Sequence, residues 1–214
     1  MQATDSTALG DATRPRRRRL VRDGVAGNSR ITGGAAVILL VLLAAEGLTI
    51  PLIGQLTEAH IFIGMLLLGP VMLKLASTGY RFARYYAGTP AYVRKGPPPL
   101  ILRLLGPVVV LTTVALFATG VALLVAGPPS NTLKLAHKVF FILWFGAMTI
   151  HVLGHVLEIP SLAMPDWRRH GGREAQLAGS GPRIMLLAAS LLVGLIIALA
   201  TFSGAAAWVS HAGG

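Results

Sequence analysis

The sequence has no cysteine in its 214 residues, and only 13% of them are charged. The absence of cysteine excludes disulfides, Cys-ligated iron–sulfur clusters and the C-x-x-C-H attachment of c-type haem. Acidic residues are scarce too, with 8 Asp and Glu against 19 Lys and Arg, so the formal net charge is +11. Low charge beside 54% hydrophobic residues argues against a soluble domain.

Long apolar runs are what the sequence has in abundance, and the mean hydropathy is +0.67. A helix needs about 20 apolar residues to cross a bilayer. Five runs meet this length, and they cover residues 34–55, 60–80, 101–126, 132–157 and 184–208. The loops between them leave no room for a second globular domain. The sequence therefore predicts an all-α integral membrane protein, a multi-pass bundle of about five transmembrane helices over residues 34–209.

The basic residues are distributed unevenly among the loops. They gather before the first run, after the second and after the fourth, while the opposite side has only Lys134 and Lys138. If the helices alternate in direction, the three basic segments share one side, which the positive-inside rule assigns to the cytoplasm. We therefore expect a cytoplasmic N-terminus and a C-terminus outside.

Residues 1–33 are polar and rich in arginine, including the run Arg16 to Arg19. We predict a disordered cytoplasmic tail that anionic lipid attracts. A nucleic-acid arm or a twin-arginine export signal fits less well, because the run lies far from the first apolar segment and no cleavage site follows it. The expected partner of this tail is membrane lipid, with no role for nucleic acid.

Three histidines lie in one apolar run, at His137, His151 and His155. Ionisable side chains are costly inside a bilayer and mark function by default. The 14-residue step from His137 to His151 returns to within about 40° of the same helix face, and His155 follows four residues later. Because imidazole is a common axial ligand of haem iron, this run favours a redox cofactor.

His60 opens the second run, and His137 lies near the start of the fourth. These two helices run in the same direction, so both histidines should lie at a similar depth near the outer face. They could then clamp the iron of one non-covalent b-type haem from opposite sides. Gly64, one turn after His60, would let the porphyrin approach the backbone. Lys134 and Lys138 would pair with the haem propionates.

The sequence does not decide whether the protein binds a second haem. His151 lies about 21 Å along the helix from His137, but the position facing it on the second helix is Lys74, so another ligand would be needed. His151 and His155 could instead hydrogen-bond between helices, or bind a metal ion, although an i, i+4 pair supplies only two ligands to zinc. His60 taken alone could also be an ordinary polar residue at the membrane interface rather than a haem ligand.

Glu46 and Lys74 are the other ionisable residues within the apolar runs. Glu46 could be a proton acceptor beside a quinone, or an acid that serves helix packing. Lys74 is near enough to the helix end to extend part of the way to the interface. A pair between the two is not expected, because they lie at different depths.

The stretches 60–70 and 135–146, with the His-x13-His spacing of the fourth run, resemble the bacterial four-helix cytochromes b. These are the membrane haem subunits of hydrogenases, formate dehydrogenases and molybdoenzymes. The resemblance covers the first four runs, with the fifth as an addition. It implies electron transfer in a respiratory chain of the bacterial cytoplasmic membrane, between a redox partner subunit and a quinone or external acceptor. It also implies that His60 and His137 are axial ligands, with His151 a ligand of any second haem.

The sequence favours an electron-carrier subunit over a catalytic one, because the loops show no nucleotide-binding or flavin motif. The rival from another class is a non-redox membrane protein, such as a transporter, sensor or assembly factor. Its histidines would serve packing or proton relay. Self-association into a homo-oligomer is compatible with either function.

Overall fold

The computed structural model describes residues 16–94, 100–128, 130–155 and 180–212. Every element in these ranges is helical, so the predicted all-α class is confirmed there. The elements are α1 (Arg16–Thr49), the 3-10 helix η1 (Ile50–Leu52), α2 (Ile53–Tyr86), α3 (Pro90–Val93), α4 (Leu100–Ala126), α5 (Asn131–His155), α8 (Ser180–Thr201), the 3-10 helix η2 (Phe202–Gly204) and α9 (Ala205–Ala212).

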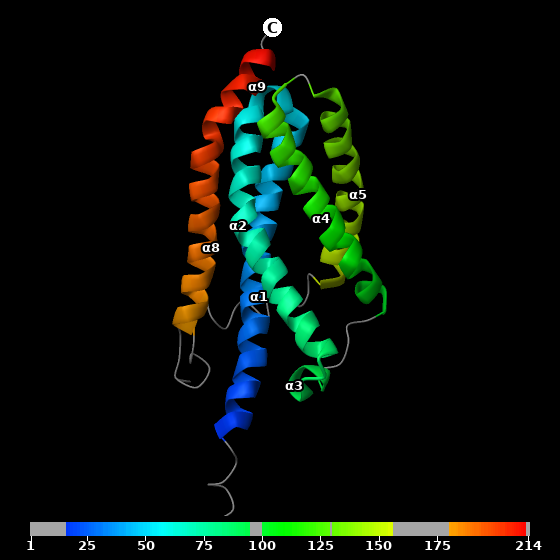
Figure 1. Cartoon of the computed structure of the whole chain (residues 1–214), viewed down its shortest axis with the longest axis vertical. Helices are drawn as coiled ribbons and strands as arrows, with labels where there is room; N and C mark the ends of the chain where they lie inside the picture. The colour runs from blue at the N-terminus through cyan, green and yellow to red at the C-terminus, as the bar shows by residue number, and fades with distance from the viewer. Residues whose placement is uncertain (1–15, 95–99, 129, 156–179, 213–214) are drawn as a thin grey trace, which may run out of the picture.

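Four helical stretches of the described chain are long and apolar enough to cross a membrane: Asn28–Tyr86, Arg103–Ala126, Asn131–Gly154 and Gly181–Ser210. The first contains both α1 and α2, which fold back on each other around η1 (Figure 1). Large apolar side chains point outward from these helices, such as Leu111, 69% exposed, and Leu153, 70% exposed. This surface suits the hydrocarbon of a bilayer and fits a multi-pass membrane protein.

The turn between the first two predicted spans was misplaced. The predicted runs 34–55 and 60–80 put it between residues 55 and 60, but α1 ends at Thr49, and α2 begins at Ile53. Pro51 explains the difference, because it lies in η1, where its missing N–H costs no helical hydrogen bond. The polar residues Gln55, Thr57 and Glu58, which we had placed around the turn, instead lie in the first turns of α2. A kink at Leu56, with φ −112° and ψ 23°, marks the transition.

In the structure α1 begins at Arg16, within the segment 1–33 that we predicted to be disordered. Arginine is a good helix former, so a run of arginines can extend an apolar helix beyond the hydrophobic segment. Residues 1–15 lie outside the described residues. The predicted fourth span, 132–157, corresponds to α5, which is described to His155.

The helices form two groups. In the first, α2 packs against both α1 and α8. In the second, α4 and α5 form a hairpin whose turn contains Gly127 with a φ of +78°. The two groups touch chiefly where a few residues of α2 pack against α4. At one end of the bundle lie η1, the α4–α5 turn and α9, and we call this the α9 end (Figure 1).

Candidate cofactor site

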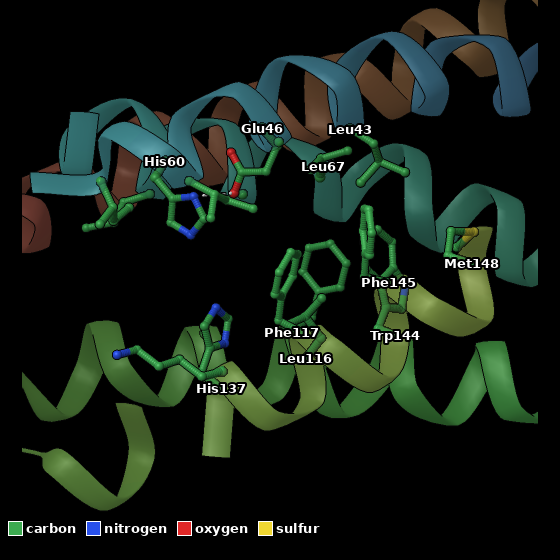
Figure 2. A pocket seen from close by; sticks show the side chains of 18 of the residues that line it. Leu43, Glu46, His60, Leu67, Leu116, Phe117, His137, Trp144, Phe145 and Met148 are labelled. Carbon is green, nitrogen blue, oxygen red and sulfur yellow. Dashed lines mark ion pairs between the residues drawn. The ribbon is translucent and has the colours of Figure 1, made fainter. Parts of the chain in front are cut away.

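A cavity of about 850 Å³ lies between α1 and α2 on one side and α4 and α5 on the other. Its volume is in the range of about 300–1,000 Å³ that is usual for small-molecule sites. Most of its wall is apolar, and Figure 2 shows side chains from both groups pointing into it, namely Leu43, Leu67, Leu116, Phe117, Trp144, Phe145 and Met148. We call it the His-pair cavity, after the two histidines described next.

His60 from α2 and His137 from α5 face each other across this cavity (Figure 2). Their ring centroids are 6.5 Å apart, and the ring planes are at 85°. The structure therefore brings these two residues together. It arises because each histidine lies near the start of its helix, and both helices start at the α9 end.

The tautomer of His137 follows from its hydrogen bonds. The Thr119 hydroxyl donates to the backbone carbonyls of Ala115, at 2.8 Å, and Leu116, at 2.9 Å. Its oxygen also lies 3.1 Å from Nδ1 of His137. With the hydroxyl proton donated to a carbonyl, we assign the donor role in this contact to Nδ1 of His137. A neutral imidazole with its proton on Nδ1 has a free lone pair on Nε2.

His60 has the same arrangement on the opposite wall. The Thr49 hydroxyl donates to the carbonyl of Glu46 at 2.6 Å, and its oxygen lies 2.9 Å from Nδ1 of His60. The Oε1 atom of Glu46 lies 3.1 Å from the same nitrogen. With the Thr49 proton donated to a carbonyl, we assign the proton of this contact to Nδ1 of His60, which leaves a free lone pair on its Nε2. Both imidazoles are thus prepared to bind one electrophilic centre between them.

The charged groups of the cavity are concentrated near this pair. Lys134 and Lys138 from α5 line it, and Glu46 is the only acidic residue among the described lining. The second oxygen of Glu46, Oε2, is buried and makes no hydrogen bond to the described residues. The cavity therefore combines a mostly apolar body with two cations and one carboxyl group beside the histidines.

Two glycines make room around the histidines. Gly64 lines the cavity as predicted, although a Cβ there would first meet Oε1 of Glu46, at 3.3 Å. At Gly120 a Cβ would lie 3.2 Å from Cε1 of His137. Gly64 thus accommodates the partner of His60, and Gly120 accommodates the ring of His137.

The structure does not bring His151 to this pair, because His151 lies on α5 but does not line the His-pair cavity. His155 also lies on α5, and its side chain is outside the described residues. Lys74 is turned to α1, where its Nζ donates to the carbonyl of Thr32 at 3.0 Å. No group of three or more His, Asp or Glu side chains gathers in the described part of the chain, so the metal-ion alternative has no third ligand there. The second haem stays a prediction.

The sequence did not indicate Thr49, Thr119, Gly120 or Trp208, all of which contribute to the site. Comparisons with protein-family models, with curated proteins and with solved structures found no match to this chain.

Proposed function

We propose that this protein is a b-type cytochrome that holds one haem in the His-pair cavity, with His60 and His137 as axial ligands, and transfers electrons. The observation that carries the proposal is the matched pair of imidazoles, which face each other across the cavity while the Nδ1 of each lies within hydrogen-bond distance of a threonine hydroxyl. Metal-binding histidines characteristically donate their second N–H to an oxygen of the protein, which fixes the ring and its tautomer.

The separation of the rings fits two ligands on one metal. With a metal–nitrogen distance of about 2.0–2.1 Å on each side, opposed imidazoles place their centroids about 6.3 Å apart. The observed value is 6.5 Å. Histidines that served only packing would be expected to have both ring nitrogens hydrogen-bonded, because buried polar atoms are almost always paired.

Haem, when bound, supplies one-electron exchange between ferric and ferrous iron. His60 and His137 fill both axial positions, so this site favours an electron carrier over an oxygen-binding centre. The apolar wall excludes water. Lys134 and Lys138 line the cavity, where they would pair with the haem propionates.

The same proposal places the chain in the cytoplasmic membrane of a bacterium as a multi-pass protein, with its N-terminus in the cytoplasm. Electrons would pass between a redox partner subunit and a quinone or external acceptor in a respiratory chain. A second haem at His151 and a homo-oligomeric state are extensions of this proposal. The support for the membrane setting is the set of apolar helical stretches with outward-facing apolar side chains.

The first test is the haem content of purified His60→Ala and His137→Ala variants. We expect the wild type to bind one haem per chain at this site, and each variant to lose its low-spin reduced-minus-oxidised spectrum. The pyridine haemochrome assay measures the haem per mole of protein. His151→Ala should keep the haem of this pair, so any haem that it loses belongs to a second site.

Two results would contradict the proposal. One is a full complement of low-spin haem in both His60→Ala and His137→Ala. The other is a colourless wild type after expression with ample haem, which would instead favour a non-redox transporter, sensor or assembly factor.

A further inference from the structure

Trp208 in α9 has a buried hydrogen-bond donor that nothing described in the chain accepts. Its indole Nε1 is fully buried and makes no hydrogen bond within the described residues. Indole N–H is only a donor, and buried donors in proteins are almost always paired. Trp208 also lines the His-pair cavity. A ligand in that cavity is therefore the natural source of the missing acceptor.

The surroundings of Trp208 favour an anionic acceptor. The Nζ of Lys134 lies 5.2 Å from the centroid of the Trp208 ring, over its face. Lys138, one turn further along α5, lines the same cavity. The one described acidic residue of the wall, Glu46, is engaged with His60 through Oε1. An N–H donor beside the Lys134 ammonium, with a second lysine in the same cavity, is a site for a carboxylate oxygen, since charge-assisted hydrogen bonds are the strongest that such donors make.

The position of Trp208 is held by contacts on both sides of the cavity. In η2, the Phe202 ring packs edge-on against Phe62 of α2, with centroids 6.1 Å apart. A Cβ at Gly204 would lie 2.9 Å from Cδ1 of Leu124, so the chain there passes directly over α4. The segment 202–208 thus contacts α2, then α4, and then α5 through Lys134. Figure 1 shows α9 at the end of the bundle where α4 turns into α5.

We propose that α9 completes the His-pair cavity, with the Trp208 indole N–H and the Lys134 ammonium binding a carboxylate of the cofactor. The inference rests on the proposed function for the identity of that cofactor, because haem has two propionate carboxylates. Trp208 is then an anchoring residue of the site, and the cation above its ring face orients the indole.

The test compares haem with haem dimethyl ester, in which both carboxylates are blocked. Trp208→Phe keeps an aromatic side chain but lacks the indole N–H, and it is also smaller than tryptophan. We expect the variant to bind haem about 10- to 100-fold more weakly than the wild type, as loss of a hydrogen bond to a charged group implies. It should bind the dimethyl ester as tightly as the wild type does. Absorbance titration of the haem-free protein in detergent measures all four affinities.

Trp144→Phe is the matched control, because Trp144 also lines the cavity but donates its N–H to Thr113 at 3.0 Å. It should change the binding of haem and of the ester by the same factor. The inference would be overturned if Trp208→Phe bound haem with the wild-type affinity, or if it lost the same factor in affinity for haem and for the ester. Either result would leave the proposed function intact. A wild type that binds neither porphyrin would overturn both.

Discussion

At the scale of single residues, two threonine hydroxyls decide what the histidines can do. Thr49 and Thr119 each donate to a carbonyl of their own helix and accept from Nδ1 of a histidine on a neighbouring one. Each therefore fixes both the ring orientation and the tautomer. An imidazole with its proton on Nε2 would present a donor to the cavity and could not bind a metal there.

Replacing Thr119 by valine tests this role, because the shape is kept and only the hydroxyl is lost. We expect Thr119→Val to bind haem about 10- to 100-fold more weakly, since partners of metal ligands typically contribute that much. Thr112→Val is the control. Thr112 lies on the same helix and donates to the Val108 carbonyl at 2.8 Å, and no hydrogen bond among the described residues joins it to a histidine. Equal haem affinities of the two variants, measured by titration, would show that the Thr119 hydroxyl does not position His137.

The histidine pair could be predicted from the sequence, whereas its threonine partners could not. A histidine in an apolar run is rare and costly, so His60 and His137 stand out, and helix direction alone places them at one depth. Threonine in such a run is ordinary. Thr113 and Thr201 make the same i−4 hydrogen bond as Thr119, so the sequence carries no sign of which hydroxyl reaches a histidine.

At the scale of elements, α2 and α8 cross at a contact between two glycines. A Cβ at Gly69 would lie 1.9 Å from the carbonyl oxygen of Ser190, and one at Gly194 would lie 2.1 Å from that of Leu66. Pro70, inside α2, is fully buried and has no N–H. Small residues allow such close backbone approach between apolar helices, where van der Waals packing holds the pair together.

We expect Gly69→Ala to destabilise the protein by about 3 kcal/mol or more, because neither backbone can move aside for the added methyl group. Gly79→Ala, also in α2, is the control. A Cβ there meets nothing within 4 Å, and alanine should stabilise the helix by about 0.5–1 kcal/mol. Thermal unfolding in detergent, followed by circular dichroism, compares the two. A Gly69→Ala variant as stable as the wild type would show that α2 and α8 do not pack this closely.

The long helices could be predicted from hydropathy, but their crossings could not. Gly69 and Gly194 look like any other glycine in an apolar helix, and the sequence does not show that they meet. The misplaced turn has a related cause. Hydropathy indicates where apolar residues end, whereas the chain reverses at Pro51, within the predicted first span.

At the scale of the whole molecule, the His-pair cavity separates two helix groups that otherwise touch little. The α4–α5 hairpin meets α2 over a short contact, and much of the space between the groups is the cavity itself. In the proposed haem protein, the cofactor forms the missing core between them. Removing it should loosen the hairpin more than the α2–α8 pair, whose packing does not involve the cavity.

Hydrogen–deuterium exchange of the protein with and without haem tests this expectation. At a free haem concentration of about 100 times Kd, binding stabilises the native state by about 2.7 kcal/mol. We expect most of the gain in protection along residues 131–145, and little change around Gly69. A uniform change over all helices would instead show that the bundle unfolds as one unit.

The 85° angle between the two imidazole planes has an electronic consequence for the proposed site. An axial imidazole interacts through its π system with the iron d orbital that lies perpendicular to its plane. Parallel planes act on the same orbital and split the dxz and dyz levels, whereas crossed planes act on both about equally. If haem occupies the proposed site, the crossed rings presented by α2 and α5 would favour a ferric iron with nearly degenerate orbitals and strongly anisotropic magnetism.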